Sequence, residues 1–196
     1  MRRFMIATAL AFLVGPAFAQ NAPANLRPTR DVAITYRVTS PSEPSHEVRM
    51  AWSVSTGKLR VESPPGGGEW TLLDQGAGSA VVVMDAQRMT MTIPSSAAAA
   101  MTQMIPAGAR FARKGPAQVA GTACTDWEVT VPQGTSTICM TEDGAMLCST
   151  GGTGDDLFLM EAISVGYGPP PALFTVPQGY REMPGSDASR ARLPAR

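Results

Sequence analysis

Residues 119–148 read VAGTACTDWEVTVPQGTSTICMTEDGAMLC and contain all three cysteines of the chain. Trp127 and Val129 alternate with polar residues, which is the pattern of a strand with one buried face. The strand that follows repeats this alternation, and Asp143-Gly144 then predicts a hairpin with a type I′ turn. The stretch therefore predicts consecutive antiparallel strands, with the cysteines on the polar face opposite the apolar side chains.

The N-terminus is typical of an export signal. Arg2 and Arg3 form a positive n-region, residues 4–14 form a short apolar core, and residues 17–19 (AFA) form a cleavage site of small residues. The apolar core is too short to span a bilayer, which needs about 20 residues. We expect residues 1–19 to be a signal peptide and the mature protein to be periplasmic, with no integral membrane segment.

Three cysteines in an exported protein predict one disulfide and one thiol. A two-residue turn at Asp143-Gly144 places Cys139 opposite Cys148, at a site where side chains of neighbouring strands come closest. This register favours Cys139–Cys148. A Cys124–Cys139 bond would close the longer loop and would remove roughly 3 kcal/mol of unfolded-chain freedom. Geometry and loop length alone leave both pairings open.

Charge and composition exclude several functional classes. The chain has 16 basic and 16 acidic residues, and removal of Arg2 and Arg3 leaves the mature chain with a formal net charge of −2. Nucleic acid and anionic membranes call for clustered positive charge, so neither is an expected partner. The 17 prolines and 19 glycines predict many turns and short strands. We expect one β-rich domain over residues 31–183, between a flexible leader (20–30) and a disordered tail (184–196).

The alternation with a period of two also runs through the N-terminal half. It predicts an antiparallel meander of six strands, near residues 32–39, 48–54, 59–61, 70–72, 81–84 and 88–93. A helix is predicted over residues 95–105, after Pro94, because its alanines have high helix propensity. Its expected apolar stripe consists of Ala97, Met101, Met104 and Ile105. This stripe should lie against the concave face of the sheet.

No group of residues in the sequence predicts catalysis. The single histidine, His46, lies at the edge of a loop rich in proline and serine, and no C-x-x-C, H-E-x-x-H or phosphate-loop motif is present. We therefore expect a protein that is not an enzyme, with no cofactor and no metal. The 12 methionines keep Cu(I) binding as an alternative, because thioethers suit that ion. Met89 and Met91, however, alternate in phase with Ile93, as side chains of a core or cavity wall would.

Short motifs in this chain resemble those of exported relatives of the Lol-type periplasmic lipoprotein carriers. The motifs are GKLRVE (57–62), RMTMTIP (88–94), G-x-x-C-x-x-W-x-V (121–129) with C-x-T-x-D-G (139–144), and LF-x-VP-x-GY (173–180). The resemblance implies a mainly β fold, a curved antiparallel sheet forming an incomplete half barrel with one or two short helices covering its concave face. It also implies a Cys124–Cys139 disulfide.

The leading functional hypothesis is a non-enzymatic periplasmic module that binds a hydrophobic ligand, a lipid or a lipoprotein acyl chain, in the half barrel. An envelope scaffold with a filled core and no ligand is an alternative, as is Cu(I) binding. The alternation places all three tryptophans on the inward-facing side. The candidate lining residues are Met50, Trp52, Trp70, Met89, Met91, Met101, Met104, Trp127 and Met140.

Overall fold

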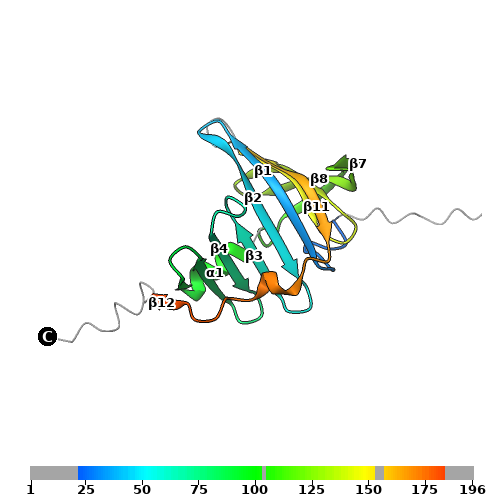
Figure 1. Ribbon diagram of the computed structural model, residues 1–196. Helices are drawn as coiled ribbons and strands as arrows, with labels where there is room; N and C mark the ends of the chain where they lie inside the picture. The colour runs from blue at the N-terminus through cyan, green and yellow to red at the C-terminus, as the bar shows by residue number, and fades with distance from the viewer. Residues whose placement is uncertain (1–21, 103–104, 153–156, 184–196) are drawn as a thin grey trace, which may run out of the picture.

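The computed structural model describes residues 22–102, 105–152 and 157–183, and within them it forms one twelve-stranded sheet (Figure 1). The expected signal peptide (1–19) and tail (184–196) lie outside the described residues, as does Met104. The elements are β1 Val32–Ser40, β2 Glu43–Ser53, β3 Lys58–Glu62, β4 Glu69–Asp74, β5 Ser79–Met84, β6 Met89–Ile93, α1 Ser95–Thr102, β7 Arg110–Val119, β8 Thr122–Val131, β9 Gly134–Met140, β10 Met146–Gly151, β11 Phe158–Tyr167, η2 Pro171–Phe174 and β12 Arg181–Met183.

The strands are ordered β12-β6-β5-β4-β3-β2-β1-β11-β10-β9-β8-β7. The chain starts in the middle of the sheet, builds the predicted meander β1 to β6, crosses to the far edge at β7 and returns strand by strand to β11 beside β1. All pairings of the described strands are antiparallel except that of β12 with β6, which is parallel. The expected mainly β, open half-barrel fold is confirmed.

The two faces of the sheet are covered by different segments. Successive residues of a strand point to opposite faces, so Leu72 and Leu73 of β4 lie on different faces of the sheet. Leu73 packs in a cluster with Ala98 of α1, on what we call the inner face. Leu72 packs in a cluster with Phe174 of η2, on the outer face. Helix α1 therefore covers the inner face and η2 the outer face.

The apolar side of α1 differs from the expected stripe. Ala98 is 2% exposed and packs on the inner face, whereas Ala97 is exposed and Met101 is 45% exposed. The helix is described over Ser95–Thr102, and the expected last residue, Ile105, lies in a bend outside it. With small alanines on all sides of the first turns, the contact with β5 and not the sequence pattern decides which side is buried.

The sheet curves around its inner face. The Tyr36 hydroxyl of β1 donates a hydrogen bond of 2.7 Å to the backbone carbonyl of Met146 on β10, although β11 separates these two strands. Tyr36 is fully buried, and burial raises the pKa of its hydroxyl far above the usual value. The hydroxyl therefore stays a neutral donor. This bond draws the two halves of the sheet together at its centre.

The β9–β10 hairpin has the predicted register at the cysteines but a different turn. Cys139 lies opposite Cys148, as expected. The type I′ turn is wrong, because it needs a positive φ at both central residues and only Gly144, at 83°, has one here. Thr141 N–H donates to the Ala145 carbonyl at 2.9 Å, which closes a three-residue loop ending in glycine. A bulge between Met146 and Cys148 restores the cysteine register.

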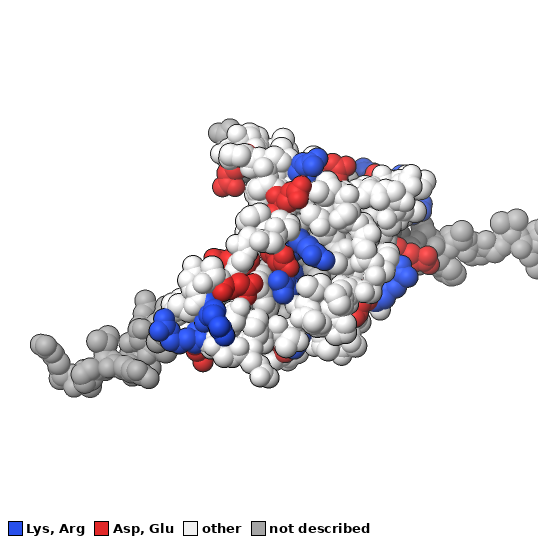
Figure 2. All heavy atoms as spheres, viewed as in Figure 1, with Lys and Arg blue, Asp and Glu red and all other residues white. Residues whose placement is uncertain are grey.

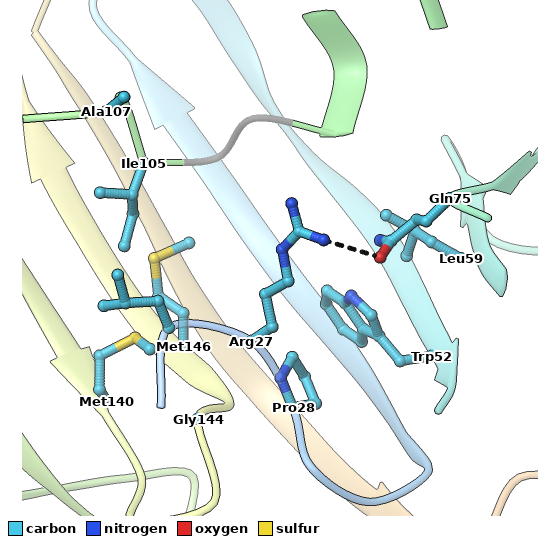
Figure 3. A pocket seen from close by; sticks show the side chains of 11 residues that line it. Arg27, Pro28, Trp52, Leu59, Gln75, Ile105, Ala107, Met140, Gly144 and Met146 are labelled. Atoms are coloured by element: carbon cyan, nitrogen blue, oxygen red, sulfur yellow. Dashed lines mark hydrogen bonds between the residues drawn. The ribbon is translucent and has the colours of Figure 1, made fainter. Parts of the chain in front are cut away.

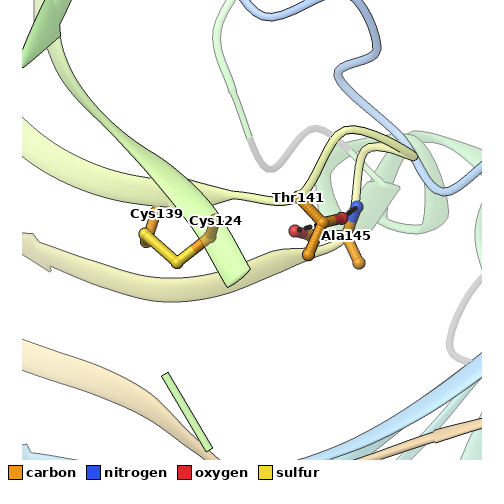
Figure 4. The surroundings of a disulfide bond; sticks show 4 residues. All are labelled: Cys124, Cys139, Thr141 and Ala145. Carbon is orange, nitrogen blue, oxygen red and sulfur yellow. Dashed lines mark hydrogen bonds between the residues drawn. A yellow bond between two sulfur atoms is a disulfide. The ribbon is translucent and has the colours of Figure 1, made fainter. Parts of the chain in front are cut away.

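The disulfide joins Cys124 to Cys139 (Figure 4), as the family resemblance implied, and Cys148 is a free cysteine. Cys139 pairs with Asp126 and Cys148, on the opposite side of the strands from Trp127 and Ile138. The expectation that the sulfurs lie on a polar surface is wrong for Cys124 and Cys139. Cys124 and Cys139 are buried in a cluster that also contains Leu147 and, at its margin, side chains of β7.

Candidate functional site

A cavity of about 240 Å³, here the inner cavity, lies on the inner face (Figure 3). Its apolar wall combines side chains from both halves of the sheet with the loop that follows α1. The residues are Trp52 of β2, Leu59 of β3, Met140 of β9, Met146 of β10, and Ile105 and Ala107 of the loop. Because β2 and β9 are separated by β1, β11 and β10, the cavity exists only through the curvature of the sheet.

The mouth of the inner cavity is crossed by residues 25–30, here the N-terminal strap. Leu26, Arg27 and Pro28 complete the wall. The strap lies against the β9–β10 loop: Thr29 N–H donates to the Asp143 carbonyl at 2.8 Å, and the Asn25 amide donates to the Glu142 carbonyl at 3.0 Å. These residues belong to the segment expected to be a flexible leader, and they hold defined positions in the structure.

Asp143 is the main anchor of the N-terminal strap. Its carboxylate accepts a hydrogen bond of 2.6 Å from Arg30 Nε, and the Arg30 guanidinium stacks on the Tyr167 ring at 3.7 Å. Partial burial of Asp143 opposes its charged form, but hydrogen bonds from Thr141 and Arg30 outweigh burial and lower the pKa of the carboxyl below its usual range. Asp143 is therefore charged, and the anchor formed, throughout the neutral pH range.

Gly144 allows the N-terminal strap to lie this close. A Cβ atom at this position would overlap the carbonyl oxygen of Arg27 and would crowd Asn25. The positive φ of 83° adds a second reason for glycine. The Asp143-Gly144 turn thus serves two partners, the hairpin that it closes and the strap that packs on it.

The structure brings only part of the predicted lining set together. Trp52 and Met140 lie in the wall of the inner cavity. Trp127 borders, with Met140, a neighbouring hollow of about 320 Å³ beneath Pro23 and Ala24. Its ring meets that of Phe111 edge-on at 6.4 Å.

Among the predicted lining residues that the structure describes, Met50, Trp70, Met89, Met91 and Met101 lie outside the wall of the inner cavity. Strand register places Met50 and Met91 on the inner face. The two methionines belong to one continuous line of paired residues that crosses the sheet from β2 to β6 on that side. Met89, two residues before Met91, shares that face. Met101 is 45% exposed to solvent.

Trp70 lies on the outer face, so the prediction that all three tryptophans point inward is wrong. It packs beside Phe174 in the outer cluster and carries the Arg60 guanidinium on its ring at 3.7 Å. Its indole N–H donates to the Asp85 carboxylate at 3.1 Å. Alternation shows that Trp70 and Leu72 share a face, but that face is covered by a segment about a hundred residues later in the chain.

Several residues of the site were missed by the sequence analysis. Met146 could have been found, because it continues the chain after the hairpin loop and lies opposite Met140. The N-terminal strap gave no signal, since Leu26 is the one large apolar side chain in residues 20–30. Its position depends on contacts with residues more than a hundred positions away.

The described residues contain no group of three or more His, Cys, Asp or Glu side chains placed to hold a metal ion. None of the helices in this part of the chain is long and apolar enough to cross a membrane. On the face shown in Figure 2, basic and acidic side chains are intermingled and no large area carries a single sign. The inner cavity, with its apolar wall, is the feature of the described structure that best fits a binding site.

No family model and no curated protein matches the sequence. Solved structures do match in fold. An uncharacterized conserved protein from Thermus thermophilus superposes with a TM-score of 0.56 at 8% identity, over 79% of this chain and 90% of the other. The complex structure of Pseudomonas aeruginosa MucA/MucB matches with a TM-score of 0.52 at 14% identity, over 74% of this chain and 55% of the other.

A LolA superfamily protein, NE2245 from Nitrosomonas europaea, is also among the similar structures, with a TM-score of 0.36 at 10% identity over 76% of this chain and 92% of the other. The LolA superfamily, which the sequence motifs were expected to resemble, is therefore represented among the similar structures. This chain spans little more than half of the chain matched in the MucA/MucB complex. At these identities the two matches with TM-scores above 0.5 show a shared fold alone.

Proposed function

We propose that this protein is a non-enzymatic periplasmic module that binds a hydrophobic ligand in the inner cavity. The observation that carries the proposal is the apolar wall formed by Trp52, Leu59, Met140 and Met146 from distant strands. Small-molecule sites are typically lined by apolar and aromatic side chains with a small number of polar groups. Methionine suits such a wall because its flexible thioether adapts to ligands of irregular shape.

The size of the inner cavity limits the ligand. At about 30 Å³ for each water-sized group, 240 Å³ holds about eight such groups. A short alkyl chain or the end of a longer acyl chain fits this volume. We propose Trp52 and Met140 as central contacts. Met50, Met89 and Met91 remain predicted contacts for a longer chain that continues along the inner face.

The fold match to the MucA/MucB structure supports a binding role. That structure is a complex between two proteins, and a binding function is the expectation that we carry over from it. The periplasmic location rests on residues 1–19, whose positive start, short apolar core and small-residue cleavage site are those of an export signal.

Uptake of N-phenyl-1-naphthylamine, an apolar dye that fluoresces when shielded from water, tests the proposal. The mature protein should take up the dye, and Ala107→Phe, which places a ring into the cavity wall from an exposed loop, should weaken uptake by at least roughly tenfold. Ala86→Phe, in the exposed β5–β6 turn, is the matched control and should bind as the wild type does.

Native mass spectrometry of protein purified from its own periplasm is the companion measurement, and should show a bound amphiphile. Equal uptake by Ala107→Phe and wild type would place the dye elsewhere and contradict the proposed site. A wild-type protein that takes up no dye and carries no ligand would favour the alternative of a scaffold with a filled core.

A further inference from the structure

We infer that the ligand of the inner cavity is an amphiphile with an anionic head group, and that Arg27 of the N-terminal strap binds this head group. The inference rests on the proposed function, since it names the class of ligand for the same cavity. Its evidence is the charge of the cavity wall and the way in which the strap holds Arg27.

Arg27 is the one charged side chain among the described residues that line the inner cavity. Its hydrogen bond goes to a neutral group, from Nη1 to the Gln75 side-chain oxygen at 3.1 Å. The ion pairs recorded for the described residues use other cations, Arg30, Arg37, Arg60 and Lys114. Among the described residues, the inner cavity therefore combines an apolar wall with a positive charge that forms no ion pair.

This combination favours an anion over a neutral or cationic head group. A guanidinium binds a carboxylate or phosphate through two parallel hydrogen bonds, which are stronger than its bond to a neutral amide. The nearby apolar side chains exclude water from part of the site, and attraction between charges increases as water is excluded. An alkyl tail would lie against Trp52, Met140 and Met146 while the head group stays at the mouth.

The backbone of the N-terminal strap fixes the position of Arg27, while its guanidinium stays free to change partners. Thr29 and Arg30, on one side, bind the carbonyl and carboxylate of Asp143 at 2.8 Å and 2.6 Å. Asn25, on the other side, binds the Glu142 carbonyl. In Figure 3 the Arg27 side chain extends across the mouth toward Gln75. A ligand has only to replace the Gln75 oxygen.

Calorimetric titration of the mature protein with decanoate and with decan-1-ol, which share a tail length and differ in charge, tests this inference. We expect decanoate to bind roughly tenfold more tightly than decan-1-ol. Arg27→Gln should remove that difference by weakening decanoate alone, and Arg27→Lys should restore part of it. Arg37→Gln is the matched control, because Arg37 is an exposed arginine of β1 outside the cavity wall. Acetate, an anion without a tail, should bind far more weakly than decanoate.

The outcomes separate the two proposals. Equal affinity of the wild type for decanoate and decan-1-ol, or a preference for decanoate that survives in Arg27→Gln, overturns the anion inference and leaves a hydrophobic site. If acetate binds as tightly as decanoate, the inference that the ligand is an amphiphile is overturned. If the wild type binds neither ten-carbon compound, both this inference and the proposed function fail.

Discussion

Whether Cys148 is a free thiol or half of a disulfide depends on where the other cysteines lie on the neighbouring strands. Alternation and the hairpin predicted correctly that Cys148 lies opposite Cys139. The same register made Cys139–Cys148 the simpler pairing, and only the family resemblance pointed to Cys124. The structure keeps Cys148 as a half-buried thiol, paired on its other side with Glu161. Burial first, and then the negative charges of Glu161 and Asp126, raise the pKa of this thiol.

The alkylation rate of Cys148 should therefore increase at a higher pH than that of an ordinary cysteine. The thiolate is the reactive form, so a raised pKa lowers the rate at pH 8 and moves the midpoint of the rate–pH profile upward. Iodoacetamide labelling of the folded protein, compared with the chain unfolded in urea, measures this shift. Glu161→Gln should accelerate labelling at pH 8, and Cys148→Ser should abolish it. Identical profiles for folded and unfolded chains would contradict the prediction.

Strands were predictable from the sequence wherever one side of the strand is buried and the other is not. Alternation identified β1 to β6 because these strands lie in the middle of the sheet or beside α1. It missed β7, whose sequence RFARKGPAQV carries a bulge between Arg113 and Gly115 and forms the edge of the sheet. Few of its side chains are covered, so no periodic pattern is required. The N-terminal strap escaped notice for the same reason.

Gly144→Ala should release the N-terminal strap. An alanine there would collide with the Arg27 carbonyl, and its positive φ adds a cost of about 1 kcal/mol. Gly121→Ala is the matched control, because Gly121 has a φ of 74° and open space around its Cβ position. Hydrogen exchange at the Thr29 amide, which bonds to Asp143, should accelerate in Gly144→Ala and stay slow in Gly121→Ala. A Thr29 amide that stays protected in Gly144→Ala would show that the strap tolerates the methyl group.

At the scale of the molecule, the sheet separates a face with a cavity from a face that is closed by the chain itself. Residues 171–180 return to the outer face, where Phe174 covers Trp70 and Leu72. Lys58 and Arg60 donate to the carbonyls of Phe174 and Leu173, which fixes this segment in place. A period of two predicts that a strand has two sides. It does not say which side a distant segment will cover, and this is why Trp70 was assigned to the wrong face.

This separation predicts that stability and ligand binding can be changed independently. Phe174→Ala removes a ring that is 4% exposed, which should lower the free energy of unfolding by about 3–5 kcal/mol. Urea denaturation measures that loss, and Phe158→Ala, at a ring that is 39% exposed, should cost less than about 1 kcal/mol. The folded Phe174→Ala protein should still bind N-phenyl-1-naphthylamine with wild-type affinity, because the inner cavity lies across the sheet from Phe174. A loss of dye binding under conditions where the variant is folded would mean that the outer segment shapes the cavity through the sheet, and the two faces would then have to be treated as one coupled unit.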